Sequence, residues 1–587
     1  NGQALAAETS RRMLFSQLLV MFANQRFKLR ACGQRAVIYM APHPPQRQKW
    51  LNELIPDNFY RELFMSPCLS GWDRGEEKHA YMGLCHQVLS RSQLNAVKKL
   101  KDAGIISRNL VVLPNLSNIS LANNGTHVSL GSLRLSRRMG ADAPDFQPRD
   151  EKYLGDLVIK IVEHFLPLFV GTYSGAPYRL DFGDMHPEKV LGFLPHELNF
   201  THLRMIWRRW KKKAHMKICG HPMTPFGPEW LDHLVSRVLR LKGDFVWDYR
   251  LLDYLACLMS TPNSSALSGE IGNDVRLKRD LAAMGIFDPA MPLYLLYRLR
   301  PFNQLGFTGF EGRHYSQFES LADDMGGAVN LQALVTALAF KWIVRQEVTH
   351  ADIPATPNIE SERRQIFFGA AIGLPTFFIA AQTPNRLLQR ILTGVQRTRP
   401  SNRYPGYVRV HQREYALGLM RLLRREAAEL VESFGLAATL DDLDRRLTAP
   451  ATNGAAGRLA QGILAETGAK SPFDLSGREF NAAAEVYYRG TLRRRQMQEG
   501  LALFAKDLAA IDAPRTWRHG IYNRHLLDLL DGRDARKYLY DHKTAILDET
   551  ANEDVLRTLI RLFILTLHHQ AEQEKNATQT TPGHRED

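Results

Sequence analysis

The sequence predicts an α+β protein, in which helices and strands alternate before a long helical region. Apolar residues recur every three or four positions within residues 8–30, 84–103, 153–169 and 328–346, which is the spacing of helices packed on one face. Residues 109–132 are instead rich in β-branched residues broken by Asn and Gly, which is typical of short strands with tight connections.

The order of these segments divides the chain into three parts. Residues 1–410 contain all the predicted strands, residues 411–569 read as helical with Gly- and Ala-rich breaks, and residues 570–587 lack apolar side chains. We expect an α+β catalytic domain, a helical C-terminal region and a disordered tail, because a segment without apolar residues cannot pay for its ordering by burial. At 587 residues the chain is long enough to bury a large core without disulfides.

Composition excludes several classes of protein. Hydrophobic residues make up 44% and charged residues 23% of the chain, which are ordinary globular values. We expect no integral membrane protein, because no apolar run approaches the roughly 18 to 20 residues that a spanning helix needs. The early apolar run Met13–Phe22 is short and contains Ser16 and Gln17, so it predicts an amphipathic helix and not a signal peptide.

Cysteine usage and net charge indicate the compartment and the class of ligand. The five cysteines are scattered, odd in number and without a C-x-x-C pair, which favours reduced thiols in a cytoplasmic protein. The net charge of +15 indicates an attraction for anions, and nucleoside triphosphates, acidic metabolites and nucleic acids all fit it.

The first stretch with chemical content is Asn123–Ser132, which contains Gly-Thr-His-Val-Ser-Leu-Gly. On a strand His127 and Ser129 point to one side and Thr126, Val128 and Leu130 to the other, because successive side chains alternate. A neutral imidazole can bind a divalent metal, although Mg²⁺ prefers oxygen ligands and needs carboxylate companions. The alternative is a strand histidine that is hydrogen-bonded at the edge of a core.

The second stretch is Gly306–Tyr315, where the period of two places Glu311, Arg313 and Tyr315 on one face. Same-face neighbours lie roughly 6.6 Å apart along a strand, so a metal on Glu311 and a phosphate on Arg313 could share one ligand. A solvated Glu and Arg pair is the alternative.

A third stretch, Ile359–Gly369, offers Arg363 or Arg364 to an anion, but charges at the start of a helix are the commoner explanation.

The order of these motifs resembles that of the glutamate-cysteine ligase type of carboxylate-amine ligase. The chain carries a Gly-Thr-His strand, a helix ending in Leu-Pro-Leu, and a Ser-Gly-Ala-Pro loop. Much later come a Phe-Glu-Gly-Arg strand, an Ala-Val-Asn-Leu-Gln-Ala-Leu-Val helix and the Arg-rich stretch. The resemblance covers about residues 8 to 385, and each of its motifs is short.

This resemblance implies a glutamine-synthetase-like fold, in which an antiparallel sheet funnel covered by helices holds ATP, Mg²⁺ or Mn²⁺ and an amino-acid substrate. It implies His127 and Glu311 as metal ligands, Ser129 and Arg313 as contacts to the nucleotide, and Arg313 with the weaker candidate Arg364 as catalytic groups. The implied reaction phosphorylates a carboxylate, usually of glutamate, and an amine displaces phosphate from the acyl-phosphate. Cationic groups are needed because charge spreads over the transferred oxygens.

The sequence also departs from the family's pattern. Ser129 stands where the family has a second His, and the acidic strands that supply most metal-binding glutamates have no counterpart before residue 8. We therefore expect that these strands belong to a longer protein, that a partner or a second copy of the chain supplies them, or that the chain does not catalyse.

A second hypothesis rests on the basic stretch 204–217, which carries seven Lys or Arg, no acid, and the interleaved Trp207 and Trp210. Such a stretch could bind nucleic acid in a non-catalytic relative by phosphate contacts and stacking. A helix with its Trp residues in the core and its cations in water explains this basic stretch better.

No Gly-x-x-x-x-Gly-Lys-Ser/Thr loop is present, which disfavours a P-loop nucleotide site.

Overall fold

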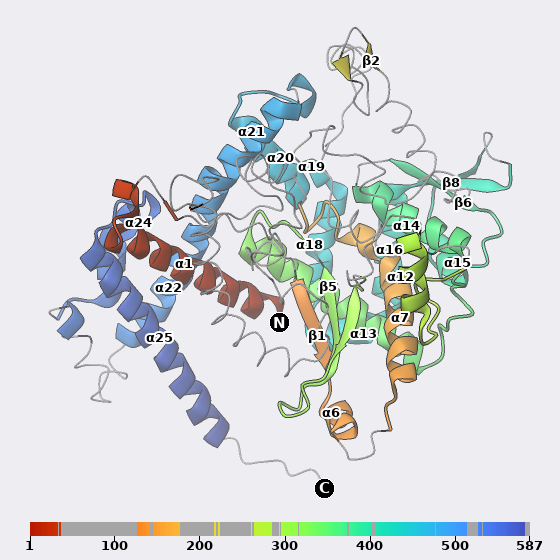
Figure 1. Cartoon of the computed structure of the whole chain (residues 1–587), viewed down its shortest axis with the longest axis horizontal. Helices are drawn as coiled ribbons and strands as arrows, with labels where there is room; N and C mark the ends of the chain where they lie inside the picture. The colour runs from red at the N-terminus through yellow and green to blue at the C-terminus, as the bar shows by residue number, and fades with distance from the viewer. Residues whose placement is uncertain are drawn as a thin grey trace.

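The computed structural model describes residues 1–32, 126–140, 145–175, 263–283, 295–314, 316–371, 375–401, 405–475, 477–512 and 532–580, with a few isolated positions between them. The predicted helix at 84–103, the predicted strands at 109–125 and the basic stretch up to residue 216 lie outside the described residues. Helices and small antiparallel sheets make up the described part, which confirms an α+β fold at that level (Figure 1).

A three-stranded antiparallel sheet forms the centre of the first region. Its strands are β1 (Thr126–Gly131), β4 (Tyr297–Arg300) and β5 (Gly309–His314), in the order β1-β5-β4. Residue 126 pairs with His314 and residue 131 with Gly309, so β1 and β5 match along their whole length. The predicted strands at both chemical motifs are therefore present, and they are neighbours although about 180 positions separate them in the chain.

Two helices cover one face of this sheet. They are α13 (Gly326–Val344), which packs against β1 and continues the π-helical turn η5 (Leu321–Met325), and α7 (Pro148–Glu163), which packs against β4. The contact is partly apolar, as in the Phe310 and Phe340 rings with centroids 5.4 Å apart. It is also polar, because the buried Tyr297 hydroxyl lies 2.6 Å from the Thr336 hydroxyl.

A second three-stranded sheet was not predicted. It has the order β6-β8-β7 and consists of β6 (Thr376–Ala380), β7 (Thr398–Pro400) and β8 (Tyr407–His411). The helix α14 (Pro357–Ala371) packs against β6, and α16 (Gln412–Glu426) follows β8 directly. The expected boundary at 410 therefore falls within the last residues of a strand.

The remaining described elements are mainly helical, as the sequence predicts after residue 411. The N-terminal helix α1 (Gly2–Arg26) packs against α13, α22 and α25, so that the two ends of the described chain share one core. The other helices are α6 (Leu133–Met139), α12 (Asn273–Ala283), α15 (Arg386–Leu392), α17 (Ala428–Phe434), α18 (Ala437–Thr448), α19 (Pro450–Asn453), α20 (Ala455–Ala465), α21 (Gly477–Tyr487), α22 (Arg493–Asp512), α24 (Ala535–Leu547) and α25 (Glu553–Thr580).

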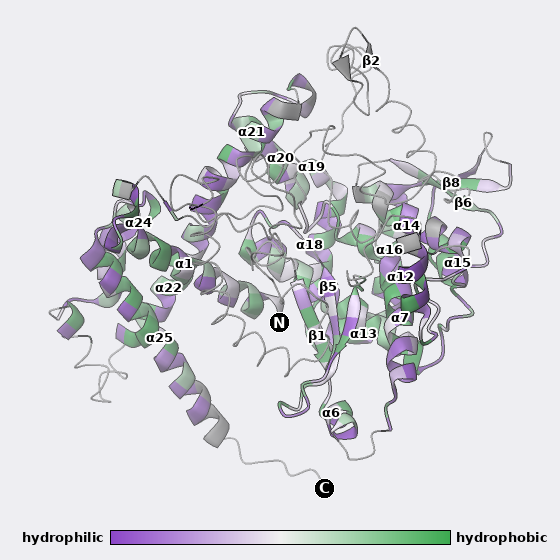
Figure 2. Ribbon diagram, viewed as in Figure 1, coloured by the Kyte–Doolittle hydropathy of each residue, from purple (hydrophilic) through white to green (hydrophobic). Residues whose placement is uncertain are grey.

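The C-terminal end of the described chain differs from expectation. The helix α25 continues to Thr580, so residues 570–580 are helical where the sequence predicts disorder; Ala, Glu, Gln and Lys are good helix formers even without an apolar face. This end is hydrophilic and projects from the body (Figure 2).

The segment Leu321–Val344 has the length and apolar composition of a membrane helix, but most of it is buried as η5 and α13.

Candidate functional site

The sheet β1-β5-β4 has one apolar face against α13 and one face lined by charged and polar side chains. Alternation along β1 places His127 and Ser129 on the charged face, and the antiparallel register sets them opposite Arg313 and Glu311. On the other side of β5, Arg298 lies opposite Glu311. The structure thus brings together residues from three separate segments of the chain.

The carboxylate of Glu311 is the centre of this cluster. Its Oε1 accepts a hydrogen bond from Arg313 Nε at 2.9 Å and a longer one from Arg300 Nη2 at 3.2 Å. The same oxygen lies 3.6 Å from His127 Nδ1. Three basic side chains therefore converge on one carboxylate oxygen, and we name Glu311, Arg313, Arg300 and His127 the sheet cluster.

Burial and charge set the ionisation of the sheet cluster. The side chains of Glu311 and Arg313 are 16% and 11% exposed, that of Arg300 only 3%, whereas that of His127 is 42% exposed. Burial alone would raise the pKa of Glu311, but the contact with His127 and the charge of Arg300 outweigh it and hold that pKa below its ordinary value. Glu311 is therefore a carboxylate at neutral pH.

The predicted residues His127, Ser129, Glu311 and Arg313 thus come from neighbouring positions on β1 and β5. The arrangement agrees with the expectation that the two motifs share one surface, while the roles proposed for each residue stay predictions. Tyr315, which the period of two also placed on this face, lies outside the described residues.

Arg364 lies elsewhere, and the structure does not bring it into the sheet cluster. It is fully buried in α14, where its Nε lies 3.3 Å from Glu163 Oε1 of α7 and its Nη1 lies 3.7 Å from Glu360 Oε2. Arg363, beside it, is also fully buried and pairs with Glu163. The helical period turns both guanidinium groups into the interior, where carboxylates neutralise them, so the proposal of Arg364 as an anion-binding catalytic group is not supported.

Arg298 and Arg300 are the residues that sequence reasoning missed. The run Tyr297-Arg-Leu-Arg alternates large apolar and basic residues, and that period of two already places both arginines on one face of a strand. Both are buried, at 8% and 3% exposure. Only the pairing of β4 with β5 shows that this face is the one that carries Glu311.

The donor set for a divalent cation is small. No group of three or more His, Cys, Asp or Glu side chains that could hold a metal occurs among the residues that the structure describes. Glu311 and His127 supply one carboxylate and one imidazole. Magnesium commonly keeps several waters and takes one or two carboxylates together with substrate phosphates, so Glu311 fits as one such ligand and would need phosphate oxygens as companions.

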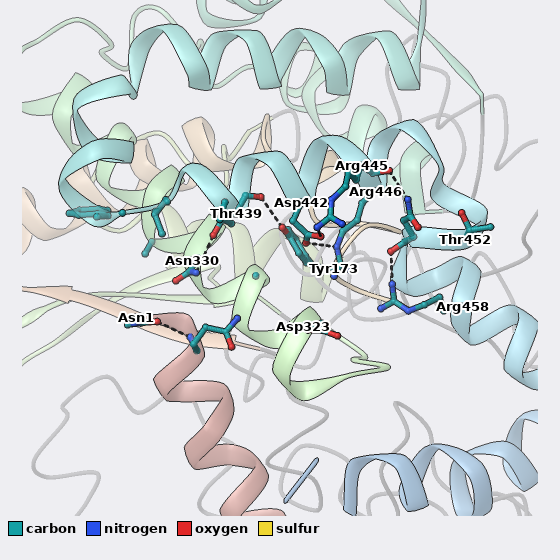
Figure 3. A pocket seen from close by; sticks show the side chains of 18 of the residues that line it. Asn1, Tyr173, Asp323, Asn330, Thr439, Asp442, Arg445, Arg446, Thr452 and Arg458 are labelled. Carbon is teal, nitrogen blue, oxygen red and sulfur yellow. Dashed lines mark hydrogen bonds and ion pairs between the residues drawn. The ribbon is translucent and has the colours of Figure 1, made fainter. Parts of the chain in front are cut away.

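A separate cavity of about 1030 Å³ lies where α1, α13, α18 and α20 meet (Figure 3). Leu130 lines it, and because Leu130 alternates with Ser129, this cavity is on the other side of β1 from the sheet cluster. Arg446 and Arg458 also line it, but both pair with the buried Asp324. These paired charges indicate a structural role, and we assign no ligand to the cavity.

Comparisons with known proteins identify no relative of this chain. No protein family, no curated protein and no solved structure matches it.

Proposed function

We propose that the protein is an ATP-dependent carboxylate-amine ligase, which forms an amide through an acyl-phosphate, and that the sheet cluster is part of its active site. The observation that carries the proposal is the convergence of Arg313, Arg300 and His127 on Glu311. We infer that β1, β5 and β4 belong to an antiparallel sheet funnel of the glutamine-synthetase type. The substrate would be glutamate or another amino acid.

The chemistry follows from the charges. Phosphoryl transfer is accelerated mainly by positioning and by cationic groups around the transferred oxygens. Arg313 and Arg300 are two fixed guanidinium groups in a partly desolvated site, where such interactions are stronger than in water. Glu311 would hold Mg²⁺ or Mn²⁺, which when bound supplies further positive charge to the phosphates. His127, at the exposed edge of the cluster, would act as a second ligand.

The reaction gives a direct test. The protein is incubated with ATP, Mg²⁺ and glutamate, with hydroxylamine added to trap an acyl-phosphate as a hydroxamate, and phosphate and hydroxamate are measured. We expect both products to need glutamate or another amino acid, and Arg313→Ala to lower their rate by roughly 100-fold or more. The matched control is Arg399→Ala, on the exposed strand β7.

Two results would overturn the proposal. One is phosphate release that does not depend on any amino acid. The other is equal turnover by Arg313→Ala and Arg399→Ala, with circular dichroism showing both variants to be folded.

The nucleic-acid hypothesis remains an alternative. Its basic stretch lies outside the described residues apart from Lys217, which begins the short strand β2 (Lys217–Ile218). No observation on the described residues therefore favours it.

A further inference from the structure

A smaller hollow, of about 490 Å³, lies between the helices α22 and α24, and we name it the α22–α24 hollow. Asp512, at the end of α22, accepts hydrogen bonds from the backbone N–H groups of Ala535 and Arg536 at the start of α24. Near the other end, Arg494 of α22 pairs with Asp548, which follows α24. The two helices therefore run antiparallel, and they lie near α1 and α25 on one side of the body (Figure 1).

The walls of the α22–α24 hollow are mainly apolar. Ala502 and Ala505 line it from one face of α22, and their short side chains leave the space open. Leu501 and Leu539 also line it, and both are buried. Tyr540 lines it as well, but this residue is 76% exposed. Aromatic residues such as Tyr are enriched at protein interfaces, so an exposed Tyr beside an apolar hollow indicates a docking surface.

Three cations surround these apolar walls. Arg536, Lys537 and Lys543 line the hollow and are exposed. The helical period sets Arg536, Tyr540 and Lys543 on one face of α24. Among the residues that the structure describes, none of the three cationic side chains enters an ion pair or a hydrogen bond. Their charges therefore face solvent beside an apolar surface.

The acidic side chain nearest to these cations is engaged by the backbone. Of the residues that line the hollow, only Asp534 is acidic. It is the N-cap of α24, and its Oδ1 accepts a 2.7 Å hydrogen bond from the backbone N–H of Lys537. A carboxylate in this position complements the unpaired N–H groups of the first helical turn. The lining of the hollow is thus positively charged, with three cations and one carboxylate.

An occupant that matches this surface has an apolar side chain with carboxylates beside it. Charge complementarity at the rim directs association and sets specificity, while the apolar side chain fills the space beside the two alanines. Acidic amphipathic helices carry both features, and docking of such a helix in an apolar groove is a recurring mode of recognition. A bilayer surface would meet the exposed rim but would not enter a hollow, so a peptide fits better.

We propose that the α22–α24 hollow is a docking site for an acidic amphipathic helix of a partner protein. The helix inserts an apolar side chain between Ala502, Ala505 and Tyr540, and its carboxylates pair with the three cations of the rim. The inference goes beyond the ligase proposal and does not depend on it, because no residue of the sheet cluster lines the hollow.

The test uses the full chain and fluorescein-labelled peptides of about 14 residues, which match the length of α24. The peptides have Glu on one helix face and Leu, Phe or Trp on the other, and binding is measured by fluorescence anisotropy. We expect saturable binding with a Kd in the micromolar range. Peptides with Ser in place of the apolar residues should not bind.

Two variants connect binding to the hollow. Lys537→Glu combined with Lys543→Glu should weaken binding by about tenfold or more, because two attractions become repulsions. Tyr540→Ala should weaken it about fivefold through lost apolar contact. The matched control is Arg137→Glu combined with Arg279→Glu, which changes the net charge equally at exposed positions on α6 and α12. It should leave the affinity within about twofold.

Several results would refute the inference. Equal losses in the two charge-reversed proteins would mean that the peptides respond only to the net charge of +15. Failure of every peptide to bind would refute it too, whether the hollow instead binds phosphatidylserine vesicles in cosedimentation or a second copy of the chain in sedimentation velocity. If the Lys537→Glu and Lys543→Glu protein does not fold by circular dichroism, Tyr540→Ala carries the test, and an unchanged affinity in that variant counts against the site.

Discussion

The side-chain amide of Gln332 donates a 2.9 Å hydrogen bond to the carbonyl oxygen of Gly312, the residue between Glu311 and Arg313. Gln332 is fully buried in α13, and its other end accepts from the hydroxyl of Thr126 on β1. One core side chain therefore joins both strands that carry the sheet cluster. The helix thereby holds β1 and β5 in position relative to each other. It also fixes the positions of the sheet-cluster residues on the opposite face of these strands.

Gly312 allows this close approach, which gives the first prediction. A Cβ atom at position 312 would lie 2.7 Å from the Tyr297 ring and 2.8 Å from Gln332 Nε2. We expect Gly312→Ala to lower the free energy of unfolding by about 1 to 3 kcal/mol through overpacking, measured by urea denaturation. The control is Gly490→Ala in the π-helical turn η7 (Tyr488–Leu492), where a Cβ meets nothing within 4 Å.

Gly490→Ala should leave stability unchanged or raise it by up to about 1 kcal/mol. Equal effects of the two substitutions would show that α13 does not contact the sheet as closely as described.

The second prediction concerns Glu311, the proposed metal-binding carboxylate. Glu311→Gln keeps the shape of the side chain but removes the charge that holds Arg313 and Arg300 and would bind the cation. We expect amino-acid-dependent phosphate release to fall by roughly 100-fold or more, and raised Mg²⁺ should not restore it. Phosphate is measured across a Mg²⁺ titration, with the exposed Glu432→Gln on α17 as the control. Full recovery at high Mg²⁺ would speak against Glu311 as the essential ligand.

A third prediction tests the buried charges beside the large cavity. Asp324 is fully buried and pairs with Arg446 of α18 and with Arg458 of α20. We expect Asp324→Asn to cost about 1 to 3 kcal/mol of unfolding free energy, because it removes the fully buried carboxylate that both guanidinium groups share and leaves Arg446 only Asp442 and Arg458 only Glu319 as acidic partners. Asp441→Asn removes an exposed partner of Arg424 and should cost at most about 1 kcal/mol. Denaturation curves that do not separate the two variants would contradict this assignment.

The fourth prediction is a pH dependence of stability that comes from Lys160. Burial, with the charge of Arg363 as the next cause, lowers the pKa of Lys160 from 10.5 to about 7, while Glu360, Asp156 and Glu163 oppose the shift. Between these two values the unfolded chain binds more protons than the folded one, so stability rises with pH from about 7 toward 10.

Lys160→Met removes this titration. We expect the unmodified protein to gain more unfolding free energy between pH 7 and pH 9 than Lys160→Met does, measured by denaturation at both values. Equal gains would show that the Lys160 ammonium is not destabilised by its surroundings.

Local pattern predicted the elements that carry the site. The alternation in Thr126–Gly131 and in Gly309–His314 identified two strands and the residues that share a face, because side-chain direction on a strand depends only on position along the chain. The helical period of Leu331, Leu334, Val335 and Leu338 predicted the core helix α13 in the same way. These are short-range properties, and the amino-acid order contains them.

Pairing between distant segments is a different kind of information. The pairing of β1 with β5 joins segments about 180 positions apart, and only the fold brings them together. β4 and β5 are only eight residues apart in the chain, but the sequence does not mark the register that sets Arg298 opposite Glu311, so Arg300 was not assigned to the site. Arg364 shows the reverse case: the resemblance made it a weaker candidate for binding an anion, but the packing of α14 on α7 buries it against Glu163.

The sequence by itself thus determined which side chains share a strand face or a helix face, because those relationships follow from backbone periods of 2 and 3.6 residues. Tertiary structure alone decided which faces meet. A guanidinium group has the same chemistry on β4, β5 or α14, and only the packing around it determines whether a carboxylate in the core neutralises it or whether it stands beside Glu311 on the charged face of the sheet.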